Sequence, residues 1–353
     1  MSDIDTDHAS TNAQPRAIFH TGRWEALPKN SFNSHLSQLS TKLPQFCLSS
    51  RSENTTKNYK YAFEAWTKWC VFNGICYLPG SDTHVSLYLI DLTETAKSHS
   101  KINEMFYAIS WAHRLAGLPD PCKSDLVLSV KEGALRLIGH TVNKKEPITP
   151  EILKHIVLLY GNEKSSLKDL RIACMCLLCF SGFLRFSELS NLKRNNITFY
   201  DSYVKLFLEK SKTDVYREGN DVLISKTYNI TCPVNMLHRY LSLANISSDS
   251  TEYIFRGLSY CKSNNSYVLR KSGKISYSSA RDILLSALHK LGLDKTKFGL
   301  HSLRSGGATA AAASKIEDRI FKKHGRWKSD RAKDGYVKEN LEERLSVTKN
   351  LGV

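Results

Sequence analysis

The stretch that decides the fold is "HSLRSGG", residues 301–307. His301 and Arg304 lie three positions apart, so they share one face if the segment is helical. The glycines and the alanine-rich run up to residue 313 let such a helix pack tightly on its neighbours. A helix N-terminus presents free N–H groups and a partial positive charge. The stretch therefore predicts a helix start that faces a phosphate group, and the alternative is a core helix with a capping histidine.

The charge of the whole chain favours an anionic partner. Its 353 residues include 50 Lys and Arg against 34 Asp and Glu, a formal net charge of +16. A surface field of that sign attracts polyanions, and nucleic acid is the first candidate. The alternative is a soluble basic protein. The length suffices for two domains, and 41% hydrophobic residues allow a sizeable core.

The cysteines indicate reduced thiols in an intracellular protein. There are nine, an odd number at irregular spacing, and residues 1–15 lack the apolar segment of a signal peptide. No apolar run is long enough to span a bilayer, so no membrane partner is expected. Cys174, Cys176 and Cys179 lie in the apolar stretch "IACMCLLCF" and are expected in the core. No second cysteine pair or nearby histidine completes a zinc site with them. The sequence also shows no P-loop, dinucleotide fingerprint or HExxH motif.

The first part of the chain predicts a tail and then a helical domain. Residues 1–49 are rich in Ser, Thr and Asn and are expected to form a disordered tail. Apolar residues at helical spacing predict four helices over residues 50–140, the second with Asp82 as its N-cap. The polar, proline-containing residues 141–149 are interpreted as a linker.

Residues 150–353 are expected to mix helices with a small sheet. Helices are predicted over 150–160, beginning at the N-cap Thr149, and over 168–192. The segment "ITFYDSYVKLFLEKSKTD" predicts a hairpin, "DVLISKTYNI" a third strand, and helices are expected after it. The expected fold class is mostly α with a small antiparallel β-sheet (α+β).

Three further patches in this part carry reactive side chains. In "SGFLRFSEL", Arg185 and Glu188 are three apart with apolar flanks, which indicates a partly buried pair; the alternative is a surface ion pair. In "EKSKTD", Lys212 lies in a turn at a strand end, where most lysines are simply solvated. In "KKHGRWKSDRAKDGYVKEN", Trp327 can donate its indole N–H to a phosphate. Tyr336 can attack phosphorus if positive charge and a base surround it.

The order Arg…Glu…Lys…His-x-x-Arg…Trp…Tyr resembles the tyrosine recombinase (phage integrase) family, over about residues 50–350. Trp327 precedes Tyr336 by nine residues, at a position that is histidine in most members and tryptophan in Cre. The run "RSGGATAAA…HGRWKSDRAKDGYV" looks most like recombinases of eukaryotic mobile elements, of the crypton and DIRS kinds. Ser305-Gly-Gly departs from the bulky residue usual after His-x-x-Arg, so local packing is expected to differ. His324 lies three residues too early and is treated as a neighbour.

The resemblance implies a helical SAM-like core-binding domain followed by a catalytic domain that cuts and rejoins DNA. Tyr336 would form a 3′-phosphotyrosine link, and Arg185 and Arg304 would hold the non-bridging phosphate oxygens. Lys212 would protonate the leaving 5′-oxygen, and His301 would assist proton transfer at the tyrosine. Trp327 would donate its N–H, and Glu188 would orient its neighbours, His301 included. No metal or nucleotide cofactor is implied.

Double-stranded DNA is the expected partner, held by the two domains as by a C-shaped clamp. The groove and phosphate candidates are Lys57, Lys60, Lys101, Asn103 and Arg114, although each also suits a solvated helix face. Leu341, Leu345 and Val347 of a C-terminal helix are expected to dock on another protomer of a homotetramer, with docking in cis as the alternative. The expected location is the nucleus for a eukaryotic mobile element, and otherwise the cytoplasm or nucleoid.

Two other functions remain open at this point. A type IB topoisomerase uses the same phosphotyrosine chemistry as a monomer, but that family usually lacks the histidine at the position of His301. A domesticated DNA-binding protein that no longer cuts would not need the complete residue set.

Overall fold

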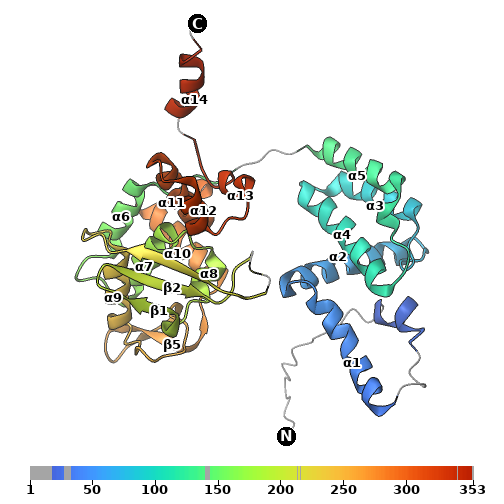
Figure 1. Cartoon of the computed structure of the whole chain (residues 1–353), viewed down its shortest axis with the longest axis horizontal. Coiled ribbons are helices and arrows are strands. Elements are labelled where there is room, and N and C mark those ends of the chain that lie inside the picture. The colour runs from blue at the N-terminus through green and yellow to red at the C-terminus, as the bar shows by residue number, and fades with distance from the viewer. Residues whose placement is uncertain are drawn as a thin grey trace. The chain divides into compact units, whose positions relative to one another are not determined.

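The chain divides into two compact units, Met1–Val142 and Asn143–Val353. The computed structural model describes residues 18–27, 33–139, 144–212, 214, 216–339 and 341–351. We call the first the helical unit and the second, after the domain that the sequence resemblance predicts, the catalytic unit. The expected fold class is confirmed, because helices dominate both units and the strands form two small antiparallel sheets in the catalytic unit (Figure 1).

The helical unit is built from five α-helices, of which the last four were expected. They are α1 (Ser34–Ser49), α2 (Glu53–Phe72), α3 (Asp82–Thr95), α4 (His99–Ala116) and α5 (Asp125–Ile138). Trp66 of α2 is fully buried in a core that α4 lines along one whole face. Gly117 ends α4 in a left-handed conformation, φ 73°, as a glycine after the last helical residue predicts. The N-cap of α3 is Ser81, not Asp82 as expected, because the Ser81 hydroxyl accepts the N–H of His84.

The expected disordered tail is wrong for residues 18–27 and 33–49. Ile18 is fully buried, and Trp24 is 6% exposed in the core of the helical unit. The Trp24 indole donates to the carbonyl of Leu115 over 2.9 Å. A short-range sequence pattern does not reveal this segment, because its two apolar anchors pack on α4, about 90 residues later in the chain. Residues 1–17 and 28–32 of the expected tail lie outside the described residues.

The catalytic unit is organised around α7 (Leu167–Ser181). This helix is apolar on nearly every face, which is typical of a helix surrounded by protein. Its neighbours are α6 (Pro150–Tyr160), α9 (Pro233–Leu243), α10 (Tyr277–Lys290) and α11 (His301–Ala313). Thr149 caps α6, as expected, by accepting the N–H of Ile152. The shorter helices of this unit are α8 (Phe186–Ser190), α12 (Asp318–Gly325), α13 (Asp330–Asp334) and α14 (Leu341–Lys349).

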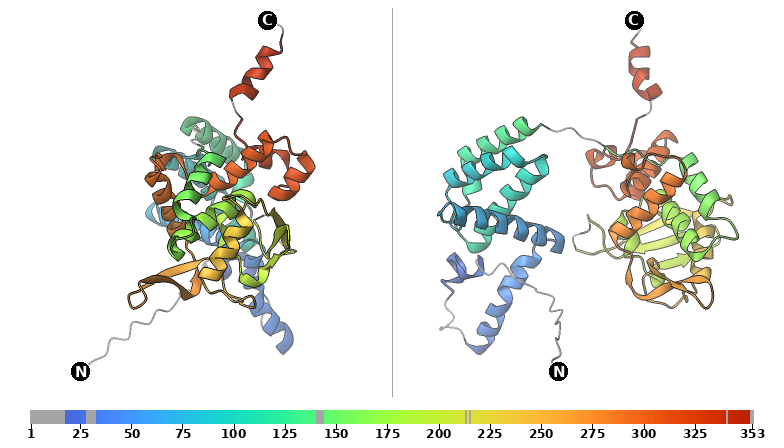
Figure 2. Two further views of the ribbon diagram at one scale, coloured as in Figure 1. Left: turned by 90° about the vertical axis from the view of Figure 1, so that its left-hand side faces the viewer. Right: turned by 180° about the vertical axis from the view of Figure 1, so that it is seen from behind.

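The expected three strands form one antiparallel sheet in the order β1-β2-β3. The strands are β1 (Ile197–Phe199), β2 (Tyr203–Leu208) and β3 (Asn220–Ser225). Val204 pairs with Ile224 and Leu206 with Val222, so one face of the sheet is buried. The sequence did not predict a second sheet, in which β4 (Arg256–Cys261) pairs with β5 (Ser266–Lys274). This hairpin, in orange, projects from the catalytic unit in both views of Figure 2.

Two expected boundaries change in the catalytic unit. The predicted helix 168–192 is interrupted after Ser181, because Phe183 adopts a left-handed conformation with φ 45° and the chain turns before α8. The second half of the expected linker 141–149 is bound to the catalytic unit. Glu146 donates its backbone N–H to Lys297, and Ile148 donates to Ser302. Residues 140–143 lie outside the described residues.

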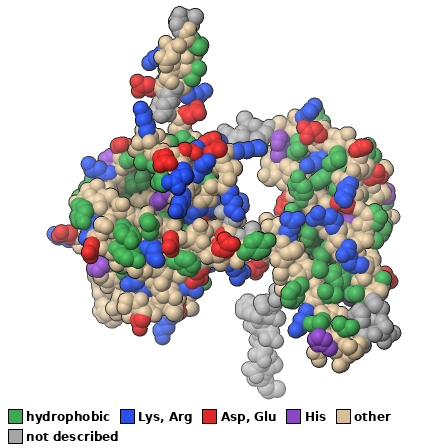
Figure 3. Space-filling view, in the orientation of Figure 1, with side chains coloured by type: hydrophobic (Ala, Val, Ile, Leu, Met, Phe, Trp, Pro, Cys, Tyr) green, Lys and Arg blue, Asp and Glu red, His purple; other side chains and the backbone are tan. Residues whose placement is uncertain are grey.

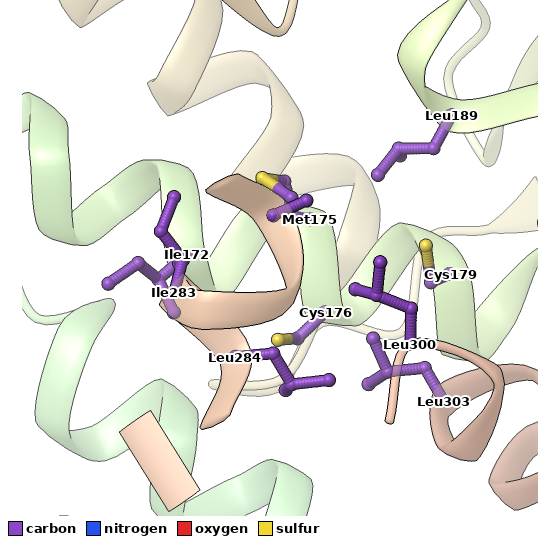
Figure 4. Close-up of a pocket in the computed structure, with 10 residues that line it drawn as sticks. Ile172, Met175, Cys176, Cys179, Leu189, Ile283, Leu284, Leu300 and Leu303 are labelled. Carbon is purple, nitrogen blue, oxygen red and sulfur yellow. The ribbon is translucent and has the colours of Figure 1, made fainter. Parts of the chain in front are cut away.

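The cysteine cluster lies in the core of the catalytic unit, as expected. Cys174, Cys176 and Cys179 are all buried, and all nine cysteines are free thiols. Figure 4 shows Cys176 and Cys179 beside a small apolar pocket between α7, α10 and the start of α11. Burial holds the pKa of Cys176 up at about 12, so this thiol stays protonated. Among the described residues, no helix is both long and apolar enough to span a membrane.

Candidate active site

The helix predicted by "HSLRSGG" is α11, and it begins at His301 as expected. The paired glycines allow its close approach to the rest of the catalytic unit. A Cβ at Gly306 would overlap the backbone carbonyl of Ile148, and a Cβ at Gly307 would overlap that of Phe180. Because both positions are glycines, the backbone of α11 can lie directly against these two carbonyls, and so against the end of α7. This packing fixes where His301 and Arg304 lie.

Arg185 and Glu188 meet through a helix cap, not along one continuous helix. Arg185 is the N-cap of α8 in an extended conformation, and its backbone N–H donates to Glu188 Oε2 over 2.8 Å. Its guanidinium also pairs with Glu188 Oε1 at 2.7 Å. The side chains of this pair are 10% and 0% exposed. The predicted partly buried pair is therefore present, but the turn at Phe183 creates it.

Glu188 is the centre of a buried cluster of three arginines. Arg326 Nη2 lies 2.9 Å from Glu188 Oε2, and Arg304 Nη1 lies 4.0 Å from the same oxygen. Burial alone would raise the pKa of Glu188, but Arg326, the Arg185 backbone N–H and the other arginines together lower it. Glu188 is therefore a carboxylate at neutral pH. It pairs with the arginines, and its expected effect on the orientation of His301 stays a prediction.

Arg304 is buried in this arrangement and does not face solvent. Its side chain donates to the backbone carbonyls of Phe183 and Gly325. Burial, followed by the charges of Arg185 and Arg326, lowers the pKa of Arg304 to about 10, so the guanidinium remains charged at neutral pH. Its Nε–H is buried without a partner among the described residues, so Arg304 keeps a donor for the expected phosphate contact.

Trp327 and Tyr336 lie over the Arg304 guanidinium. The guanidinium carbon is 4.9 Å from the Trp327 ring centroid and 4.8 Å from that of Tyr336. The two rings are 5.6 Å apart and tilted by 40°. Trp327 also packs on Phe183 and Phe321, and its indole N–H is buried without a partner among the described residues. An unpaired buried donor is costly, and it suits a site that gains an acceptor on binding.

His301 lies near Tyr336, and the charge of Lys212 acts on it. The His301 ring is 6.3 Å from that of Tyr336. Burial of the ring and the charges of Arg304, Arg185 and Lys212 lower the pKa of His301 below its usual 6.5. His301 is therefore neutral at pH 7 and able to accept a proton. Lys212 is exposed in the connection between β2 and β3, as predicted, and its charge reaches His301.

The predicted DNA-binding residues lie on two neighbouring helices of the helical unit. Lys57 and Lys60 are on α2, and Lys101, Asn103 and Arg114 are on α4. Three of them, at positions 57, 101 and 114, are exposed. Lys60 lies 3.9 Å from Glu64, and the amide of Asn103 donates to the carbonyl of His99 within its own helix. Their contact with DNA stays a prediction.

Basic side chains also gather on the catalytic unit over α12 and α13, beside the site (Figure 3). Lys323, Lys328 and Arg331 are exposed there. Lys322 and Lys333 are instead tied to Asp318 and Asp330. Within the described residues, no group of His, Cys, Asp and Glu has the arrangement of a metal site.

The sequence did not identify Arg326 as part of the site. Its guanidinium donates to Glu188 and to the carbonyls of Gly182, Phe183 and His324. The only available signal was its place directly before Trp327 in "HGRW". His324, treated as a neighbour, bonds to the carbonyl of Ser181 over 2.8 Å and packs on Phe183.

Comparisons with known proteins place the chain in a family. Residues 153–343, more than half of the chain and including all seven predicted catalytic residues, match the model of the phage integrase family. The integrase/recombinase XerD homolog of Selenomonas ruminantium is 29% identical over 317 residues, 89% of each chain. Recombinase Cre of Escherichia phage P1 is 21% identical over 296 residues, which cover 78% of this chain and 81% of that protein. The crystal structure of the XerH site-specific recombinase bound to its palindromic difH substrate shares the fold, with a TM-score of 0.56 at 13% identity, covering 84% of this chain and 77% of that one.

Proposed function

Because the chain belongs to the phage integrase family of tyrosine recombinases, we propose that it cuts and rejoins double-stranded DNA through a 3′-phosphotyrosine link at Tyr336. The observation that carries this proposal is the gathering of Tyr336, His301 and the arginine cluster at the start of α11. The Tyr336 ring lies 4.8 Å from a buried guanidinium and 6.3 Å from a neutral imidazole. A phenol becomes a nucleophile only with a base and a positively charged phosphate site nearby, and this cluster supplies both.

The proposed reaction exchanges one phosphate ester for another. The phenolic oxygen of Tyr336 attacks the scissile phosphorus, the bond from phosphorus to the 5′-oxygen breaks, and the phenolic proton passes to His301. Lys212 gives a proton to the departing 5′-oxygen. Arg185 and Arg304 stabilise the charge that develops on the non-bridging oxygens, where removing one such donor typically costs about 2.7–4 kcal/mol. The link conserves the energy of the broken bond, so rejoining needs no nucleotide.

In this proposal, the enzyme becomes competent only on DNA. Without DNA, the Tyr336 ring lies over the Arg304 guanidinium. A phosphate bound at the site would supply an acceptor for the Arg304 Nε–H, which is buried without a partner among the described residues. The same phosphate supplies an acceptor for the unpaired Trp327 indole N–H. The resting arrangement therefore keeps the nucleophile stacked until a substrate binds.

We propose double-stranded DNA as the partner and a homotetramer as the assembled form. The net charge of +16 supports the first point, and binding should weaken steeply with added salt. Among related structures, XerH is bound to its difH substrate and a lambda integrase dimer to a COC′ core site. The second point rests on α14, where Leu341, Leu345 and Val347 are exposed and thus available to another protomer.

We further propose that the reaction integrates or excises a mobile element. The support is the resemblance of "RSGGATAAA…HGRWKSDRAKDGYV" to recombinases of eukaryotic mobile elements. A nuclear location follows if the host is eukaryotic. Imaging of the tagged chain in its host, together with a polymerase chain reaction across the rejoined flanks, would test both points.

The experiment that tests the chemistry uses nicked suicide duplexes made from the DNA that flanks the coding sequence. Wild type and Tyr336→Phe are incubated with them and resolved on denaturing gels. A covalent band on the 3′ end that is lost in the variant supports the proposal. No band on any duplex, with binding intact, would indicate a DNA-binding protein that does not cut. Relaxation of supercoiled plasmid without strand exchange would indicate a type IB topoisomerase.

A further inference from the structure

Helix α11 carries two hydroxyl side chains that bind the segment containing Tyr336. The Ser305 hydroxyl donates to the backbone carbonyl of Tyr336 over 2.7 Å. The Thr309 hydroxyl oxygen accepts the backbone N–H of Lys338 over 3.0 Å. Positions 305 and 309 are one turn apart and therefore share one face of the helix. The two hydrogen bonds thus bracket the nucleophile segment on both sides of Val337.

Local structure alone holds this segment weakly. Tyr336 follows α13, a helix of only five residues, and its backbone N–H bonds to the carbonyl of Lys333. A single helical turn is marginal in water without tertiary contacts. The side chains add three contacts: the Tyr336 ring packs on Trp327 and over the Arg304 guanidinium, Val337 packs against the cluster around Phe183, and Lys338 forms an ion pair with Glu146. That ion pair is exposed and contributes little.

The same helix that makes these two bonds also carries His301 and Arg304. The hydrogen bonds of Ser305 and Thr309 both start from α11. One rigid helix therefore fixes the backbone of Tyr336 relative to its proposed base, His301, and its phosphate-binding arginine, Arg304. The small residues that follow Arg304 make two kinds of contact. Gly306 and Gly307 allow close packing on the α7 side, while Ser305 holds the nucleophile segment.

We propose that Ser305 and Thr309 form a hydroxyl clasp that positions Tyr336 against the active site of its own protomer. They are positioning residues and do not touch the phosphate. This inference rests on the proposed function, since it assigns them to the reaction of Tyr336.

The test uses the full-length chain with Ser305→Ala, with Thr309→Val, which preserves shape, and with both changes. Ser314→Ala is the matched control, because Ser314 ends the same helix and its hydroxyl bonds only to Ala310 of that helix. Loss of one neutral hydrogen bond should slow covalent adduct formation about fivefold. Loss of both should release the segment and slow it by about 10- to 100-fold, with DNA binding unchanged. Rates within twofold of the control would overturn the proposal.

Two further readouts separate positioning from other roles. A 5′-bridging phosphorothiolate duplex has a leaving group that needs no proton, so it should rescue Lys212→Ala and not the double variant. Mixing the double variant with Tyr336→Phe should restore no activity, because neither chain has both the tyrosine and its clasp. Rescue of the double variant by the phosphorothiolate, or restored activity in the mixture, would contradict a clasp that acts within one protomer.

The clasp can also be measured without any reaction. Hydrogen exchange of the Lys338 amide, followed by mass spectrometry of peptides covering residues 335–339, should be slow in wild type and the control and at least tenfold faster in the double variant. Equal exchange rates would refute the clasp, whatever the activity. Faster exchange in the double variant, together with a wild-type chain that forms no adduct on DNA, would retain the clasp while removing the proposed function.

Discussion

Replacing Glu188 with glutamine should destabilise the catalytic unit by about 3–5 kcal/mol. The carboxylate lies 2.7 Å from Arg185 and 2.9 Å from Arg326, with Arg304 at 4.0 Å, and its side chain is fully buried. Each of the two close pairs is attractive by about 6 kcal/mol at an effective dielectric constant of about 20. Desolvation of the four charges offsets most of this sum. The glutamine removes the attraction and leaves three buried arginines without a counter-charge.

The measurement is the free energy of unfolding of the catalytic unit, read from urea-dependent hydrogen exchange of α7 peptides in the whole chain. Glu209→Gln is the matched control, because Glu209 makes an exposed ion pair with Lys193 at 3.6 Å and should cost less than about 1 kcal/mol. Since the pKa of Glu188 is lowered in the folded protein, its stabilisation is present above the unfolded carboxyl pKa and is lost as pH falls through the folded value. A loss for Glu188→Gln no larger than for the control would refute the idea that this carboxylate holds the arginines.

Three other predictions follow from the described contacts. Because the pKa of His301 is lowered, the rate of adduct formation should stay constant as pH falls through 6.5 and decline only at lower pH. A decline centred above pH 6.5 would contradict a neutral base. Gly306→Ala should destabilise the catalytic unit by about 1–3 kcal/mol in chemical denaturation. Gly133 on α5 has open space around it, so Gly133→Ala should instead stabilise the helical unit by up to about 1 kcal/mol. Trp24→Ala should cost the helical unit about 3–5 kcal/mol in the same assay, while Phe46→Ala at a 73% exposed side chain should change little; equal effects would remove residues 18–27 from the core.

Local patterns predicted much of the fold because local physics determines it. The Thr149 cap, the glycine after α4 and the apolar α7 each act within a few residues of their position. The turn at Phe183 was not predictable, because a phenylalanine with positive φ has no signature in sequence. It is held in place by hydrogen bonds from Arg304 and Arg326, more than 120 residues later in the chain.

The site residues were predictable as chemical types but not as an arrangement. The sequence showed arginines, a histidine and a tyrosine in a suggestive order, and the family supplied their roles. It did not show that Arg304 would be buried under Tyr336, because charge in a sequence carries no information about burial. Arg326 was missed for the same reason, since its importance depends on Glu188, which is 138 positions away.

The attachment of residues 146–148 to the start of α11 has a mechanical consequence. Two backbone hydrogen bonds, from Glu146 to Lys297 and from Ile148 to Ser302, anchor the chain where it enters the catalytic unit. Tension transmitted along the backbone from the helical unit therefore loads these two bonds first. Ser302 is the residue after His301, so the load arrives at the first turn of α11. A pull on the connection between the units is thus delivered to the residue next to His301, the base in the proposed reaction.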